Sequence, residues 1–290
     1  MTSVLYDVPG PRARRRERLG SVIGFLILLA ALGGAVWYAA RNGVFGVDRW
    51  DVLFDPPKNQ TAADVWRFML VDGLGATLRA AVVAAPMALV LGLVLAVWRT
   101  ARQRWLRLPA ILVIELFRGL PVLLMMFFGL LGFGWQAFTA VVFGLTVYNM
   151  AIIAEILRSG LASLPRGQAE AGYAIGLTRG QTLFTILLPQ AVRTMLPSLI
   201  AQLVVLLKDS SLGFIVGYAE LLKSMQNNAQ YFGNQYYVAL FVAGAGTYLV
   251  VNLTLSWAAR WIQRRTTRTA GVAPVADEIA VQSAAGTRER

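Results

Sequence analysis

The residues of this chain that could do chemistry lie inside or at the edges of long apolar segments. They are Glu115, Arg118, Glu155, Arg158, Lys208, Asp209, Ser210 and Ser211. The chain has no histidine and no cysteine, which excludes Ser-His-Asp catalysis, a thiolate nucleophile and the commonest metal ligand. Only a Ser-Lys pair such as Lys208 with Ser210 remains for catalysis. Because these two side chains lie on diverging helix faces, we expect no catalytic residues and no metal site.

Two of the acidic residues are followed three positions later by an arginine. This spacing lets two side chains pair on one helix face. We expect Glu115 to pair with Arg118, and Glu155 with Arg158 where a helix finishes near the membrane surface.

Lys208 and Asp209 lie between the apolar residues 203–207 and 212–216. Charges are costly inside a bilayer, so a charged pair in this position is expected to have a functional role. Arg79 lies nearer the end of its segment, where a long side chain can reach the membrane surface.

The composition predicts an integral membrane protein. Hydrophobic residues make up 57% of the 290 residues and charged residues 14%, against about 25% charged residues in soluble domains. The net charge of +12 could indicate nucleic acid binding. The arginines, however, lie at the ends of the apolar segments, which favours the positive-inside rule of membrane proteins and no nucleic acid partner.

Six segments are apolar and long enough to cross a bilayer. They lie near residues 20–40, 74–98, 108–131, 136–157, 194–218 and 237–261. Arginine clusters precede the first segment, follow the sixth, and separate the second from the third and the fourth from the fifth. All four clusters lie on one side only if the chain has six spans and both termini in the cytoplasm.

This topology divides the chain into five parts. They are a basic cytoplasmic tail 1–19, an N-terminal span 20–40, an extracytoplasmic segment 41–72, a transmembrane domain 73–262 and a cytoplasmic tail 263–290. The first span could be a cleavable signal peptide, but its length favours a retained anchor. The composition of the last tail is typical of a disordered end.

A polar segment rich in glycine separates the fourth and fifth spans. We expect a short helix from Gln168 to Ile175 that stops at Gly176, because glycine can take the left-handed conformation. A capping box over 178–181 then starts a second helix, which Pro189 is expected to end. Such a helix pair outside the bilayer favours a docking surface over an ordinary loop.

Four motifs occur here in the order found in one family of transporters. They read Glu115-Leu-Phe-Arg118-Gly119-Leu-Pro121, Ala154-Glu155-Ile-Leu-Arg158, Gln168-Ala-Glu170-Ala171-Gly172 with Gly176 and Ile186-Leu-Leu188-Pro189-Gln190-Ala191, and Lys208-Asp209-Ser210-Ser211-Leu212 with Glu220-Leu221. Over about residues 70–262 the chain resembles membrane subunits of ATP-binding cassette (ABC) importers of the polar amino acid (histidine/glutamine/glutamate) permease family. The additional first span resembles glutamate-uptake permeases of high-GC bacteria.

The resemblance implies an all-α polytopic protein with the type I ABC importer permease fold, about six transmembrane helices and a cytoplasmic coupling-helix loop at residues 160–190. It implies three protein partners: an ABC ATPase dimer, a second permease subunit and an extracytoplasmic solute-binding protein resting on residues 48–64 and 231–237. The chain has no Gly-x4-Gly-Lys-Ser/Thr sequence, so it cannot hold ATP by a P-loop. ATP and magnesium would bind to the ATPase, and this chain would be neither an enzyme nor a cofactor-binding subunit.

The resemblance also assigns roles to residues. Coupling to the ATPase maps onto Glu170, Ala171, Gly172, Gly176, Leu188 and Pro189. Candidates for the translocation path are Glu115, Arg118, Pro121, Met125, Lys208, Asp209, Ser210 and Ser211. Gly172 replaces the alanine of the family pattern, a change that is conservative in size. Leu120, Met125 and Ala201 stand where the family often has polar residues, so a different second permease subunit could supply polar contacts.

The expected activity is import of a polar amino acid across the bacterial cytoplasmic membrane. Arg79, Arg118 and Lys208 favour an anionic, glutamate-like substrate, although we expect Arg118 to pair with Glu115 and Lys208 with Asp209. The alternative is a secondary, ion-coupled transporter, which would show inverted repeats and broken helices at the bilayer midplane. A requirement for ATPase subunits distinguishes the two classes. Whether two identical or two different permeases pair stays open.

Overall fold

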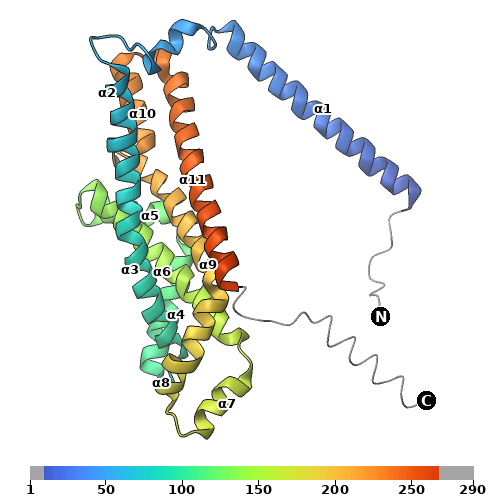
Figure 1. Ribbon diagram of the computed structural model, residues 1–290, viewed down its shortest axis with the longest axis vertical. Coiled ribbons are helices and arrows are strands. Elements are labelled where there is room, and N and C mark those ends of the chain that lie inside the picture. Colours follow the sequence, from blue (N-terminus) through green and yellow to red (C-terminus); the bar gives the residue numbers. More distant parts are fainter. Residues whose placement is uncertain (1–9, 268–290) are drawn as a thin grey trace.

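The computed structural model describes residues 10–267, and this part of the chain consists of helices and the turns that join them (Figure 1). Residues 1–9 and 268–290 lie outside the described part, and with them most of the predicted disordered tail. The helical segments are α1 (Pro11–Arg41), η1 (Val47–Arg49), η2 (Asp51–Leu53), α2 (Ala62–Arg67), η3 (Phe68–Leu74), α3 (Gly75–Thr100), α4 (Arg104–Gly119), α5 (Val122–Phe127), η4 (Phe128–Gly132), α6 (Ala137–Ser163), α7 (Arg166–Ala174), α8 (Arg179–Thr182), η5 (Leu183–Leu187), α9 (Leu188–Asp209), η6 (Ser210–Phe214), α10 (Leu221–Phe232), η7 (Asn234–Tyr236) and α11 (Tyr237–Thr267).

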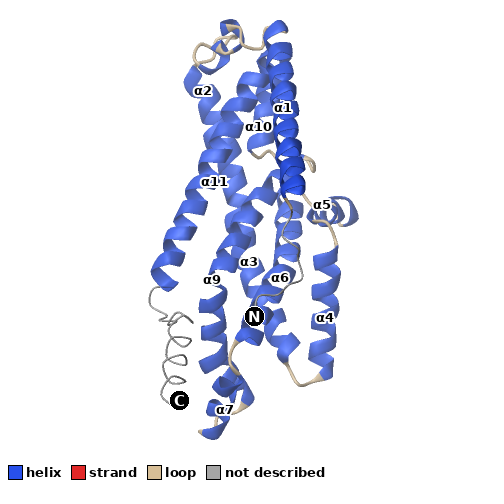
Figure 2. Cartoon of the chain, turned by 90° about the vertical axis from the view of Figure 1, so that its right-hand side faces the viewer, coloured by secondary structure: helices blue, strands red, loops and turns tan. Residues whose placement is uncertain are grey.

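The long helices form an elongated bundle, and α1 lies apart from it. Figure 1 shows α7 and α8 at one end of the bundle and α2 and α10 at the other; we name these the α7 end and the α10 end. Figure 2 shows from the side that α3, α6, α9 and α11 all run along the long axis. The apolar side chains of α1 are exposed, including Phe25 and Ile27. A helix of this length and apolarity can cross a bilayer, as the sequence predicts for residues 20–40.

Within residues 10–267, five helical stretches are long and apolar enough to span a membrane, and a bent helix pair, counted as one span, makes a sixth. The pair is α4 with α5 and η4, whose axes meet at 103°. The predicted span over 108–131 is therefore a helix pair broken at Pro121 and not a straight helix. Leu120 is extended, with φ −95° and ψ 138°, because a residue before proline avoids the helical region and proline cannot donate a backbone hydrogen bond.

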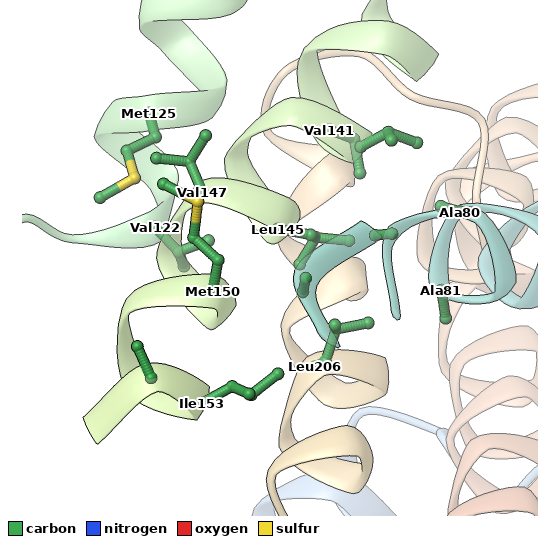
Figure 3. Packing of buried hydrophobic residues seen from close by; sticks show 14 of the residues in the cluster. Ala80, Ala81, Val122, Met125, Val141, Leu145, Val147, Met150, Ile153 and Leu206 are labelled. Atoms are coloured by element: carbon green, nitrogen blue, oxygen red, sulfur yellow. The ribbon is translucent and has the colours of Figure 1, made fainter. Parts of the chain in front are cut away.

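Helix α6 is the centre of the bundle and contacts α3, α4, α5 and α9. Small residues of α3 allow close approach, since Ala84 and Ala88 are fully buried and a Cβ on Gly92 would lie 2.7 Å from Ile153 Cγ2. Figure 3 shows Met125 of α5 beside Val147 of α6 in this core. Packing through small residues is the usual means by which helices associate in lipid.

The fifth span differs from its prediction at both ends. It is continuous from α8 through the π-helical η5 into α9, so Pro189 lies in the first turn of α9 and ends no helix. The stretch is π-helical directly before this proline, and a local π adjustment is one way in which a helix accommodates the missing N–H of proline. At the other end, α9 stops at Asp209 and the 3-10 turn η6 follows within the predicted span 194–218.

Between the fifth and the last span lies the helix α10. It packs against η3 and α11 at the α10 end. A second apolar core there contains the fully buried Val52, Met69 and Leu240. The short 3-10 turns η1 and η2 are thereby held against the bundle.

Candidate functional site

The loop after α7 closes in the form expected from its glycine. Gly176 has φ +85°, the left-handed conformation that glycine takes without strain. The Leu177 N–H donates to the Gly172 carbonyl at 3.1 Å and the Gly176 N–H to the Tyr173 carbonyl at 3.0 Å. These two bonds make a Schellman motif, which fixes the direction in which the chain leaves α7.

The second short helix, α8, begins at the predicted capping box. Thr178 Oγ1 accepts from the Gln181 N–H at 3.4 Å, and Gln181 Oε1 accepts from the Thr178 N–H at 2.9 Å. A further bond between side chains, from Gln190 Nε2 to Gln168 Oε1 at 3.2 Å, joins the start of α9 to α7. The loop is thus a defined helix pair.

Gly172 is where α7 and α8 touch. The residue is buried, and a Cβ there would lie 2.7 Å from Thr182 Cγ2 and 3.1 Å from Ile186 Cδ1. Thr182 cannot turn away freely, because its hydroxyl donates to the Thr178 carbonyl at 3.0 Å. The close approach of the two helices therefore favours glycine here, although the change from the family's alanine is conservative in size.

We predict that Gly172→Ala loosens α7 from α8. Overpacking of this kind costs about 1–3 kcal/mol, so a protease should cleave the 164–178 segment faster in detergent-purified protein. The control is Gly167→Ala on the same helix, where a Cβ meets nothing within 4 Å and alanine should favour the helix. Equal cleavage rates in the two variants would contradict the packing role.

The α7–α8 pair presents an exposed surface of mixed character. Glu170 and Ala171 are exposed, and the Glu170 carboxylate forms no ion pair within residues 10–267. Ile175 is 75% exposed and Tyr173 45%. An acidic group beside exposed apolar side chains is suited to docking on a protein partner. Of the remaining coupling candidates, Leu188 is buried and Pro189 is exposed.

A network of charges joins three helices within the bundle. The predicted pairs both form, with Arg118 Nη2 2.6 Å from Glu115 Oε2 and Arg158 Nη2 2.6 Å from Glu155 Oε1. Arg99 of α3 bridges them, since its guanidinium lies 2.9 Å from Glu155 and 3.5 Å from Glu115. Pairing offsets part of the cost of holding these charges in the bundle.

The polar stretch at the end of α9 is satisfied mostly by backbone groups. Ser210 is fully buried and its hydroxyl donates to the Leu207 carbonyl at 2.6 Å; Ser211 donates to the Lys208 carbonyl at 2.8 Å. Ser210 therefore does not bond the Lys208 ammonium, and no Ser-Lys catalytic pair forms. Tyr248 of α11 also donates to the Lys208 carbonyl, at 3.0 Å.

The expected ion pair between Lys208 and Asp209 is absent from the described residues, and that prediction was wrong. Neighbouring residues on a helix point about 100° apart, which keeps the two groups separate. Lys208 is exposed, and within residues 10–267 its Nζ makes neither an ion pair nor a hydrogen bond. Arg118, in contrast, is paired, and Arg79 lies 5.0 Å from the centre of the Phe138 ring.

The other path candidates are separated by the fold. Met125 is 3% exposed and packs in the core of this chain, whereas Pro121 is exposed at the bend between α4 and α5. In the described part of the chain, no hydrogen bond or ion pair connects Lys208 or Asp209 to the network of Arg99. The structure therefore separates the polar stretch around Lys208 from the charge network of Arg99.

Two polar contacts were not foreseen from the sequence. The position of Arg99 at the end of an apolar segment indicates only topology and predicts no partner for it. Asn149 of α6 is fully buried and its Oδ1 accepts from Gln202 Nε2 of α9 at 2.7 Å. A buried amide in an apolar segment is a recognisable signal, because such groups need partners.

Glu220 lies between the fifth and last spans and is fully buried. Its Oε1 accepts from the Lys223 N–H at 2.9 Å and so caps α10, while Oε2 has no partner among the described residues. Burial raises the pKa of Glu220 to about 7, because the charged form loses its hydration. The carboxyl is therefore divided between neutral and charged forms near neutral pH.

Comparisons with known proteins agree with this architecture. A family profile described as "Binding-protein-dependent transport system inner membrane component" matches residues 88–268. The chain is 42% identical to a glutamate transport system permease protein of Corynebacterium glutamicum over 77% of this chain and 82% of that protein. It is 36% identical to a probable glutamine ABC transporter permease protein of Bacillus subtilis, over 68% and 94% of the two chains.

Solved structures give the same result. A crystal structure of an amino acid ABC transporter with histidines matches with a TM-score of 0.62 and 30% identity, covering 68% of this chain and 94% of that chain. An inward-facing structure of a methionine ABC transporter, 23% identical, matches with a TM-score of 0.59 over 68% and 96% of the two chains and supports the fold. The chain belongs to the family of inner-membrane components of binding-protein-dependent transport systems.

Proposed function

We propose that this chain is the permease subunit of an ABC importer that carries a polar amino acid, with glutamate as the favoured substrate. The observation that carries the proposal is the α7–α8 pair, which is rigidly closed by the Schellman turn and the capping box and exposes Glu170. Glutamate is favoured because a permease of glutamate transport is 42% identical to this chain. The broken α4–α5 pair alone would also suit a secondary transporter, but family membership favours the ATP-driven class.

In this proposal α7 and α8 dock on a separate ATPase dimer that binds ATP and magnesium. Closure of the dimer moves the helix pair, and the continuous stretch from α8 through η5 into α9 carries the movement into the membrane. A rigid-body movement of this kind requires that the helix pair stays fixed to the start of α9. The hydrogen bond between the Gln190 and Gln168 side chains holds α7 against the start of α9.

The opposite end of the bundle has the features of a docking surface for a solute-binding protein. The two segments expected there, 48–64 and 231–237, are adjacent: Lys58 Nζ donates to the Tyr231 carbonyl and lies 4.6 Å from the centre of the Tyr231 ring. A hollow of about 530 Å³ beside them is lined by Gln60, Asp64, Arg67, Phe68, Asp72, Asn227, Asn228 and Tyr231. Polar side chains around a hollow favour a protein partner.

The test is reconstitution of the complete importer in liposomes. ATP hydrolysis and uptake of labelled amino acids are measured with the solute-binding protein and with glutamate, glutamine or arginine. We expect glutamate to stimulate ATP hydrolysis most and to be taken up only when the ATPase is active. Uptake driven by an ion gradient without the ATPase would contradict the proposal, and a preference for glutamine or arginine would change the substrate.

We predict a topology with both termini in the cytoplasm. Reporter fusions after Arg107 and Arg166, at the α7 end, should report the cytoplasm. Fusions after Lys58 and Asn228, at the α10 end, should report the outside. The reason is the arginine bias of the segments between spans. An outside signal at Arg166 would overturn both the topology and the docking of α7 on a cytoplasmic ATPase.

A further inference from the structure

A basic cavity lies at the α7 end, between the connection from α3 to α4 and the α7–α8 pair. It has a volume of about 730 Å³. Its lining residues come from two parts of the chain, 97–107 and 161–187: Val97, Thr100, Ala101, Arg102, Gln103, Arg107, Leu161, Tyr173, Arg179, Gly180, Leu183, Phe184 and Leu187. The fold thus joins two arginine clusters that the sequence shows only as separate topology signals.

The cavity has an unbalanced positive charge. Arg102, Arg107 and Arg179 are all exposed, and none forms an ion pair within residues 10–267. No acidic residue is among the lining residues. Arg99 and Arg158, by contrast, are held by carboxylates. Three free guanidinium groups around one cavity favour a multivalent anion such as a phosphate ester.

The lining also has an apolar side, and its position matches a membrane surface. Leu161, Leu183 and Leu187 belong to the ends of α6 and η5, next to the apolar spans. On the neighbouring helices Trp98 is 42% exposed and Trp105 is 72% exposed. Exposed tryptophans at the ends of spans mark the level of the lipid headgroups.

We propose that this cavity binds an anionic phospholipid. The phosphate oxygens would accept hydrogen bonds from the three arginines, and an acyl chain would lie along the leucine side. Basic pockets between transmembrane helices on the cytoplasmic side are suited to anionic headgroups. Because Tyr173 of α7 is part of the wall, the lipid would touch the helix pair that we propose docks on the ATPase. The lipid site itself requires only that this end of the bundle lies at a membrane surface.

The test is a titration of the detergent-purified full chain with phosphatidylglycerol, with bound lipid counted by native mass spectrometry. Arg102→Gln/Arg179→Gln should weaken binding about 30-fold, since each arginine near an anionic headgroup contributes about 1 kcal/mol and 1.4 kcal/mol is tenfold. Arg104→Gln/Arg193→Gln removes the same charge from exposed arginines outside the cavity and should leave the affinity unchanged. Phosphatidylcholine should bind much more weakly than phosphatidylglycerol.

Three outcomes would overturn the proposal. Equal weakening in both double variants would show general attraction by positive charge. Displacement of the lipid by inorganic phosphate alone would show a site for free anions. The third arm repeats the lipid count on the assembled importer. If assembly removes the lipid, an acidic group of the ATPase occupies the cavity instead.

Discussion

Uptake should fall to background when Gly176 is replaced by valine, while the protein still reaches the membrane. At φ +85° a β-branched residue is strained by about 1–3 kcal/mol. A Cβ there meets nothing within 4 Å, so the defect arises from the backbone and not from a clash. The Schellman turn would open, and α7 would no longer be fixed relative to α8.

The measurement is uptake by the complete importer at matched membrane levels of the permease, together with ATP hydrolysis by the assembled complex. Gly176→Asn provides the graded control, because asparagine tolerates the left-handed conformation better than valine does. We expect uptake in the order glycine, asparagine, valine. If a well-expressed Gly176→Val importer transports at the wild-type rate, this turn is not a coupling element.

The local features of the helix pair could be predicted because each depends on residues close together in the sequence. A glycine at the end of a short helix and a threonine three residues before a glutamine specify a turn and a cap almost alone. The pair of Glu115 with Arg118 could be predicted for the same reason. The number of spans could be predicted from the apolar segments and from the arginines between them. Local chemistry decides these features, so the structure confirmed the turn, the cap and the pair.

The features that could not be predicted depend on packing between segments that are distant in the sequence. Pro121 signals a break, but the 103° bend also requires α5 to pack against α6. Pro189 resembles a helix end until α8 and α9 are seen to form one stretch through η5. The tight packing at Gly172 could not be predicted, because nothing in the sequence places Thr182 against it.

The charge network of Arg99 could not be predicted from the sequence either. Arg99 follows an apolar segment, so the positive-inside rule explains it fully and gives no reason to seek a partner. The structure brings it to Glu115 and Glu155, which are 16 and 56 residues away. Interactions across helices need the fold, whereas interactions within one helix turn do not.

The second large effect is expected at Lys208, the one cation of the three named as favouring an anionic substrate that has no partner among the described residues. We predict that Lys208→Met lowers uptake about 10- to 100-fold, because a hydrogen bond to a charged group contributes about 1.5–3 kcal/mol. Membrane abundance should change far less, since the exposed ammonium forms no ion pair within residues 10–267. Lys208→Arg keeps the charge and should restore part of the uptake.

The form of the loss identifies the role of the charge. If Lys208 binds the substrate carboxylate, the half-saturation concentration should rise; if it acts in gating, the maximal rate should fall instead. Uptake is therefore measured against substrate concentration at matched permease levels. Lys223→Met is the control, because Lys223 lies on α10 and its ammonium is already bonded to Gln226 at 3.0 Å. Unchanged kinetics in Lys208→Met would show that this charge has only a structural role. The assignment of Lys208 to the translocation path would then be wrong.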